Sequence, residues 1–133
     1  MNKHIIAGSA GLTIQDGILR LGPIMRYGLQ VTGKPSPRIC FIGTAGGDDA
    51  TQTAAFYTAC IGEAVTPSHL QLFSMPNVPD VRAHLLAQDI LWVSGGSVAN
   101  LLAVWRVHGL DVILREAWEH GVVLAGVSAC SVC

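Results

Sequence analysis

The residues best suited to chemistry lie near the end of the sequence, in the stretch Gly126-Val127-Ser128-Ala129-Cys130. A serine between small residues after an apolar run is typical of a sharp turn from a strand into a helix, which exposes the serine hydroxyl. The peptide N–H of the next residue, Ala129, then faces a developing oxyanion. The second flanking position, where glycine is usual, holds Cys130. The pattern fits a nucleophilic Ser128, and it also fits an ordinary strand end made of small residues.

The same stretch contains a pair of cysteines, Cys130 and Cys133, with the C-x-x-C spacing of redox and zinc sites. Such a pair becomes reactive when it opens a helix, and it forms only half of a structural zinc site. The sequence offers no second pair, so we expect no metal and no cofactor. A nucleophilic Cys130 is a third possibility. We expect the four cysteines to be reduced thiols, with Cys40 in the core.

Three more stretches of small residues also follow apolar runs. They are residues 8–11, 43–47 and 94–97. Ligands of open parallel α/β sheets bind outside the carboxyl ends of the strands, where such loops meet. The sequence therefore predicts a site at this edge of the sheet. Gly95 and Gly96 are candidates for the second oxyanion donor, and a plain tight turn is the alternative for their loop.

Apolar runs and helical patterns alternate along the whole chain. We expect strands at residues 4–7, 38–42, 69–73, 90–93 and 122–127, and helices at about 22–32, 49–61, 79–87, 98–107 and 111–120. Strands separated by helices predict right-handed crossovers and an open parallel sheet. We expect a single α/β domain over residues 1–133. Gly109 is expected to separate the last two helices, and Asp48 or Asp49 to cap the helix at 49–61.

A serine nucleophile needs a positioned base, which is usually histidine. No histidine follows Ser128 in the sequence. His108 and His120 are expected at helix ends, where a cation is favoured, and His69 and His84 in surface contexts. The motifs of this chain therefore do not complete a catalytic triad.

The composition limits the kinds of partner. Of 133 residues, 50% are hydrophobic and 13% are charged, with a formal net charge of -1. The chain should fold, and the absence of a basic stripe argues against nucleic acid as a partner. No apolar run is long enough to cross a bilayer, so we expect no membrane association and a soluble, cytoplasmic protein. The scarcity of polar surface leads us to expect a homo-oligomer.

Several motifs in order resemble one known family. They are GTAGGD at 43–48, LLAQDI at 85–90, VSGGSVANLLAVWRVHGLD at 93–111, LREA at 114–117 and AGVSA at 125–129. Together they closely resemble the dipeptidase E (aspartyl dipeptidase) family of serine peptidases, to which cyanophycinase is related. The resemblance covers nearly the whole chain.

The resemblance implies a flavodoxin-like, class I glutamine amidotransferase-like sandwich of three layers with a mainly parallel sheet. It implies that Ser128 is the nucleophile, that Gly95, Gly96 and Ala129 form the oxyanion hole, and that the substrate is a small peptide with an N-terminal aspartate. The family's Gly-Gly-Gly-Asn loop is Ser-Gly-Gly-Ser at residues 94–97, and the glycine after Ser-Ala is Cys130.

The family also continues past residue 133, where its histidine and acidic triad members lie. We therefore expect a chain truncated after the nucleophile motif, lacking the C-terminal part of the fold, and inactive or impaired by itself. The alternative from another class is a non-catalytic module that binds a small ligand or associates with itself.

Overall fold

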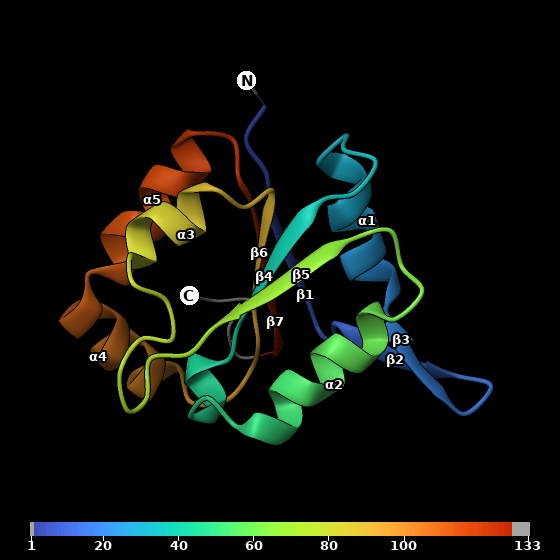
Figure 1. Ribbon diagram of the computed structural model, residues 1–133, viewed down its shortest axis with the longest axis horizontal. Helices are drawn as coiled ribbons and strands as arrows, with labels where there is room; N and C mark the ends of the chain where they lie inside the picture. The colour runs from blue at the N-terminus through green and yellow to red at the C-terminus, as the bar shows by residue number, and fades with distance from the viewer. Residues whose placement is uncertain (1, 129–133) are drawn as a thin grey trace.

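A parallel five-stranded sheet forms the centre of the computed structural model, which describes residues 2–128 (Figure 1). The strands are β1 (Ile5–Gly8), β2 (Leu12–Gln15), β3 (Ile18–Leu21), β4 (Arg38–Ile42), β5 (Thr66–Leu70), β6 (Ile90–Val93) and β7 (Val123–Val127). The helices are α1 (Pro23–Val31), α2 (Ala50–Cys60), α3 (Val81–Leu86), α4 (Val98–His108) and α5 (Leu110–Glu119), with a short 3₁₀ turn at Thr44–Gly46. The order in the sheet is β1-β7-β6-β4-β5, and every neighbouring pair is parallel.

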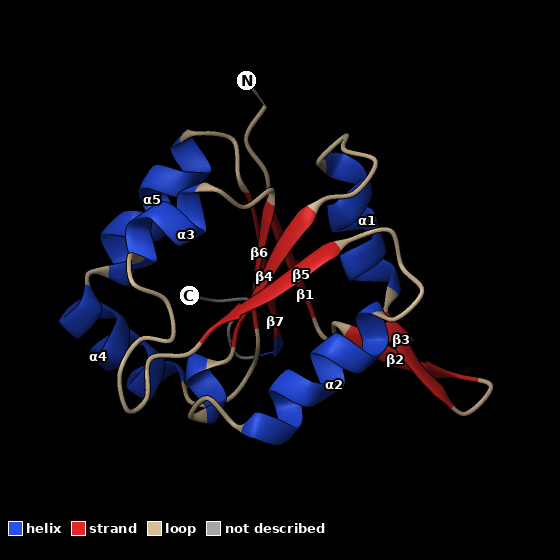
Figure 2. Ribbon diagram, in the orientation of Figure 1, coloured by secondary structure: helices blue, strands red, loops and turns tan. Residues whose placement is uncertain are grey.

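Helices cover both faces of this sheet (Figure 2). On one side lie α3, α4 and α5, and on the other lie α1, α2 and the hairpin of β2 and β3. The predicted α/β class, with a parallel sheet between two helical layers, is confirmed. Among residues 2–128, no helix is both long enough and apolar enough to span a membrane.

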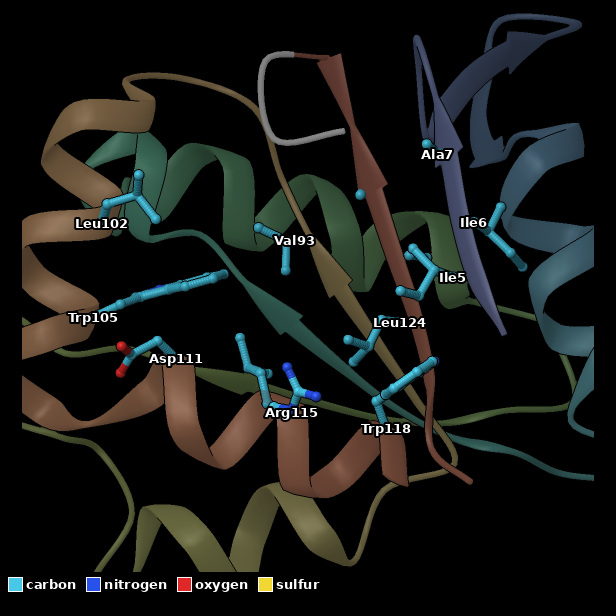
Figure 3. A pocket seen from close by; sticks show the side chains of 13 residues that line it. Ile5, Ile6, Ala7, Val93, Leu102, Trp105, Asp111, Arg115, Trp118 and Leu124 are labelled. Carbon is cyan, nitrogen blue, oxygen red and sulfur yellow. The ribbon is translucent and has the colours of Figure 1, made fainter. Parts of the chain in front are cut away.

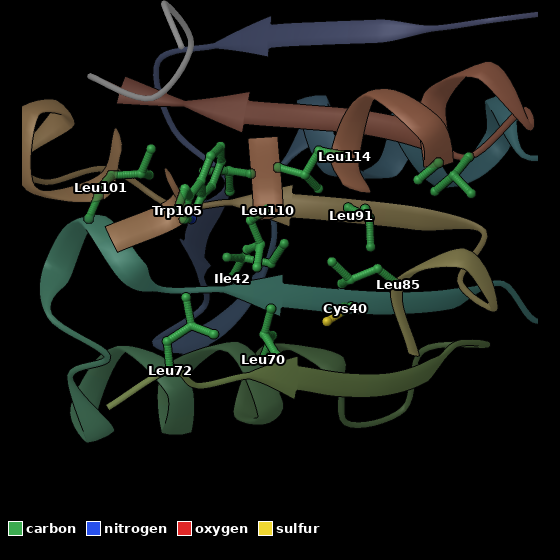
Figure 4. Close-up of a cluster of buried hydrophobic side chains, with 14 residues drawn as sticks. Cys40, Ile42, Leu70, Leu72, Leu85, Leu91, Leu101, Trp105, Leu110 and Leu114 are labelled. Carbon is green, nitrogen blue, oxygen red and sulfur yellow. The ribbon is translucent and has the colours of Figure 1, made fainter. Parts of the chain in front are cut away.

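The inner strands are apolar on both faces because both faces are covered. All four residues of β6 are buried, and so are the last four of β4. Cys40 and Ile42 of β4 pack toward α3, α4 and α5 (Figure 4), whereas Ile39 and Phe41 pack toward α2 on the other side. Cys40 is thus a core residue, as predicted.

Side-chain caps begin the helices where the sequence predicts them. Asp49 accepts a hydrogen bond from the N–H of Gln52 at 3.3 Å and begins α2. Ser97 accepts from the N–H of Asn100 at 3.2 Å and begins α4. Gly109, in the left-handed region with φ of +68°, ends α4, as expected for a residue without a Cβ.

The structure differs from the sequence-based expectation in two places. The hairpin of β2 and β3 was not predicted, although Asp16 and Gly17 at its turn both have positive φ, and Asp-Gly is a strong hairpin signal. The strand expected at 69–73 is β5, Thr66–Leu70, displaced toward the N-terminus. Pro67 is the second residue of β5, and a proline is tolerated there because β5 is an edge strand.

Candidate active site

Four loops meet at the carboxyl edge of the sheet, because β1, β4, β6 and β7 all run in the same direction. These are the loops that the sequence predicts to form the site. The two that matter most follow β6 and β7, which are neighbours in the sheet. Their closeness brings Gly95 to Ser128.

Ser128 follows β7 directly and is exposed. Its φ is +58°, in the left-handed region that a residue with a Cβ seldom occupies. Holding such a conformation costs on the order of 1–3 kcal/mol, and this cost is common at functional turns. The conformation is the one expected of a serine on a strained turn at the end of a strand.

Gly95 packs directly against Ser128. A Cβ built on Gly95 would lie 2.7 Å from the Cβ of Ser128 and 3.0 Å from its Oγ. Real Cβ atoms do not approach this closely, so the position admits glycine alone unless the backbone shifts. The loop after β6 therefore places its backbone beside the serine hydroxyl.

Gly96 packs against a different loop. Its φ is +149°, and a Cβ there would lie 2.2 Å from the carbonyl oxygen of Ala45. The next residue, Ser97, donates its N–H to the same carbonyl at 2.8 Å. The loop after β6 is therefore held between Ser128 on one side and the 3₁₀ turn after β4 on the other.

A buried hydrogen bond ties the same 3₁₀ turn to α4. Nε1 of Trp105 donates to Oγ1 of Thr44 at 3.1 Å, and Thr44 is only 2% exposed. Trp105 lies two turns into α4, the helix that the loop at 94–97 leads into. The sequence does not predict this contact, because nothing in the spacing of two residues 61 positions apart signals it.

The acidic pair in the loop after β4 has structural roles. Asp49 caps α2, and Oδ2 of Asp48 accepts the N–H groups of Leu72 at 2.8 Å and Phe73 at 3.0 Å. These bonds fix the segment after β5 against the loop after β4. The two carboxylates therefore hold the segments around the site in place.

The five histidines all lie away from Ser128. His69 belongs to β5, three strand spacings or about 14 Å across the sheet from β7. His108 ends α4, about 15 Å along that helix from its first residue. His4 and His120 precede the first residues of β1 and β7, at the opposite edge of the sheet.

The remaining histidine, His84, lies on α3 with Nε2 3.3 Å from Oγ of Ser68. His69 and His84 are half-buried, so the expectation that both lie in surface contexts is wrong. Nδ1 of His69 lies 2.8 Å from the hydroxyl of Tyr57, and burial lowers the pKa of His84, with Arg38 and His69 adding to the effect. The expected positions of His108 and His120 at helix ends are confirmed.

The two described thiols are unsuited to nucleophilic chemistry. Burial raises the pKa of Cys40 to about 12, and burial together with the charge of Glu63 raises the pKa of Cys60 to about 11. Within residues 2–128, no group of three or more histidine, cysteine or acidic side chains is arranged to hold a metal ion.

The predicted site residues thus divide into two groups. Ser128 and Gly95 are brought together, and Gly96 supports their loop through Ala45. Ala129, Cys130 and Cys133 lie outside the described residues.

The arrangement defines a class of protein: a parallel α/β sandwich with a serine on a strained turn after an inner strand and a glycine loop packed against it. The chain belongs to peptidase family S51, whose model matches residues 5–133. It is 42% identical over 132 residues to the "Uncharacterized peptidase YgaJ" of Bacillus subtilis (strain 168), covering 98% of this chain and 56% of that relative.

A solved structure shares the fold. The crystal structure of a protein described as "Putative Peptidase E Protein", from Listeria monocytogenes EGD-e, superimposes with a TM-score of 0.71 at 18% identity, covering 96% of this chain and 59% of the other. The chain therefore spans somewhat more than half the length of the proteins it matches. The family named from the sequence motifs is confirmed.

Proposed function

We propose that this chain carries the nucleophile half of a serine dipeptidase site, with Ser128 as the nucleophile. The observation that carries the proposal is the left-handed conformation of Ser128, with φ of +58°, at the carboxyl end of β7. A strained backbone at an exposed serine is a feature of nucleophile turns. Ser128 leaves no room for a Cβ at position 95, so Gly95 brings the backbone of its loop beside the serine, where a second oxyanion donor is needed.

In the proposed reaction, Oγ of Ser128 bonds to the carbonyl carbon of the scissile peptide while the serine proton passes to a base. The carbonyl electrons move onto the oxygen, and the N–H groups of Gly95, Gly96 and Ala129 stabilise that charge. Breaking the C–N bond releases the amine with the transferred proton. Water then cleaves the acyl group from Ser128 and restores its hydroxyl.

The proposed substrate is a small peptide with an N-terminal aspartate. This assignment rests on the resemblance of the motifs at 43–48, 93–111 and 125–129 to the aspartyl dipeptidases. The start of α4, capped by Ser97, adds support because the positive end of a helix dipole favours a carboxylate nearby.

We further propose that the chain by itself is inactive or strongly impaired. All five histidines lie far from Ser128 in the fold, so none is placed to accept the proton of its hydroxyl. Serine sites without their base retain only the contribution of the oxyanion hole and of binding. The base is expected from the part of the family fold that this chain does not span.

The test uses two proteins, the 133-residue chain and an extended chain. The extended chain is this sequence joined after Cys133 to the part of the Bacillus subtilis relative downstream of the match. Hydrolysis of Asp-Leu is measured for each, with Ala-Leu as the comparison substrate. We expect turnover of Asp-Leu by the extended chain and a loss of about 10³-fold or more in its Ser128→Ala variant.

Ser36→Ala is the matched control, because Ser36 is an exposed serine in the loop before β4. This variant should keep the full rate. For the 133-residue chain alone, wild type and Ser128→Ala should be equally slow. An extended chain that cleaves Asp-Leu equally well without the Ser128 hydroxyl would overturn the nucleophile assignment. Background rates alone, equal in the extended chain and its Ser128→Ala variant, would instead favour the non-catalytic ligand-binding module.

A further inference from the structure

A small apolar pocket lies at the carboxyl edge of the sheet, close to the candidate site. It has a volume of about 300 Å³ and lies between the 3₁₀ turn after β4, the segment after β5 and the first turns of α4 (Figure 1). Phe73, Ala103 and Val104 give it apolar walls, and none of the described residues that line it is charged. Its volume is at the lower end of the range for ligand pockets, so it suits one side chain better than a whole ligand.

This pocket is separate from a larger groove of about 550 Å³ on the side of the sheet that α4 and α5 cover (Figure 3). Leu102 and Trp105 of α4 line that groove over β1 and β7, whereas Ala103 and Val104 line the small pocket. The two hollows share no lining residue within the described part of the chain. Substitutions in the small pocket therefore leave the lining of the groove intact.

The small pocket adjoins the loop that contacts Ser128. Ala45 belongs to its lining, and the carbonyl oxygen of Ala45 would lie 2.2 Å from a Cβ built on Gly96. The preceding residue, Gly95, packs against Ser128. β4 is two strands away from β7 in the sheet, or about 10 Å. Since an extended residue spans about 3.3–3.6 Å, a peptide bound at Ser128 reaches the pocket with a long side chain of a residue near the scissile bond.

Hydrogen bonds hold the walls of the pocket in place. Oδ2 of Asp48 accepts the N–H of Phe73 at 3.0 Å, and Nε1 of Trp105 donates to Oγ1 of Thr44 at 3.1 Å. Phe73 is nevertheless 48% exposed. An aromatic side chain on a segment fixed in this way offers preformed apolar surface to a ligand.

The chemistry of the pocket indicates which part of the proposed substrate it can take. A carboxylate is costly to bury without a partner, and the described lining offers no cation. The aspartate side chain therefore does not belong there. Because the aspartate is the first residue of an Asp-X peptide, everything beyond it lies on the leaving side of the scissile bond. The pocket thus fits the side chain of X.

We propose that this pocket binds the side chain of the second residue of the substrate and selects Asp-X peptides in which X is leucine, phenylalanine or another large apolar residue. The inference rests on the proposed function, because the pocket has this role only if Ser128 attacks the bond after the aspartate. A hydrophobic pocket distinguishes side chains that differ by one methylene by about tenfold or more. Glycine, which leaves the pocket empty, should therefore be a poor second residue.

The experiment measures kcat/KM of the extended chain defined above for Asp-Phe, Asp-Leu and Asp-Gly. We expect the values for Asp-Phe and Asp-Leu to exceed that for Asp-Gly by at least about tenfold. Phe73→Ala removes a wall of the pocket but keeps the backbone N–H that Asp48 accepts, and it should lower the ratio of Asp-Phe to Asp-Gly at least about threefold. Met75→Ala is the matched control, because Met75 is 72% exposed on the same segment and lies outside the lining, and it should keep the ratio.

A second variant fills the pocket. Ala103→Phe adds a ring from α4 and should lower kcat/KM for Asp-Phe at least about fivefold more than that for Asp-Gly, because the added ring and the substrate ring compete for the same space. Ala54→Phe is its control, since Ala54 is an exposed alanine of α2 outside the lining.

Three outcomes would overturn this inference and leave the proposed function standing. The first is an equal kcat/KM for the three substrates, with all three activities lost in Ser128→Ala. The second is a preference for Asp-Phe that neither Phe73→Ala nor Ala103→Phe changes. The third is a preference for Asp-Gly-Phe over Asp-Gly-Gly without one for Asp-Phe over Asp-Gly, which would assign the pocket to the third residue.

Failure of the proposed function gives a different result. Hydrolysis that survives Ser128→Ala, or only background rates with all three substrates, would overturn the nucleophile assignment and this inference with it.

Discussion

The contact between Gly95 and Ser128 makes a sharp prediction about stability. A methyl group in Gly95→Ala would start 2.7 Å from the Cβ of Ser128, an atom that moves only with its backbone. Overpacking of this kind costs about 1–3 kcal/mol. In a Ser128→Gly background the nearest remaining atom is the carbonyl oxygen of Val127 at 3.5 Å, which is an ordinary contact. There the same substitution should cost less than about 0.5 kcal/mol, within the usual error of additivity.

The assay is a double-mutant cycle by urea denaturation, followed through tryptophan fluorescence. We expect a coupling free energy of about 1 kcal/mol or more between the two positions. The strain that Ser128→Gly relieves cancels in the cycle, because it is present with and without the methyl group introduced by Gly95→Ala. A control cycle with Ser36→Gly should show no coupling. Additive effects for Gly95→Ala and Ser128→Gly would refute the placement of the loop after β6 beside the serine.

The remaining predictions concern three other places in the fold. Trp105→Phe removes the donor to the buried Thr44 hydroxyl and should lower the free energy of unfolding, measured by urea denaturation, by about 1–3 kcal/mol. Thr44→Val in the same protein should restore part of this loss, and an unchanged denaturation midpoint in Trp105→Phe would contradict the bond. The pKa of His84 is lowered in the fold, so the unfolded chain binds the proton more readily, and the free energy of unfolding should be full above the unfolded pKa of about 6.5 and fall as the pH drops toward the folded pKa. His84→Gln should reduce this dependence of the free energy of unfolding on pH. With Cys130 and Cys133 replaced by serine, Cys40 and Cys60 should resist a thiol reagent at pH 8 in the native protein and react in urea, because their pKa values are about 12 and 11.

The sequence was sufficient to predict the sheet and its edge of small residues. Continuous apolar runs such as β6 identify covered strands, and caps such as Asp49 and Gly109 mark helix ends through local hydrogen bonds and backbone freedom. These signals are local, so they can be recognised in the sequence without knowledge of the tertiary structure. The displaced β5 shows the limit, since whether Pro67 is tolerated depends on the position of the strand in the sheet.

The site itself was predictable only in part. The types and spacing of Gly95 and Ser128 made them candidates for the site, but their contact depends on β6 and β7 being neighbours. The packing of Gly96 on Ala45 and the bond from Trp105 to Thr44 join segments far apart in the sequence, and no periodic pattern encodes them.

Covalent labelling is the most direct test of Ser128 as the proposed nucleophile of a peptidase site. The extended chain is treated with a fluorophosphonate, which phosphonylates activated serines, and the adduct is located by peptide mass spectrometry. We expect one stoichiometric adduct on Ser128, formed in parallel with loss of Asp-Leu hydrolysis and missing from the 133-residue chain. Complete inactivation with the adduct on another residue, or hydrolysis that continues after Ser128 is fully labelled, would contradict the nucleophile assignment.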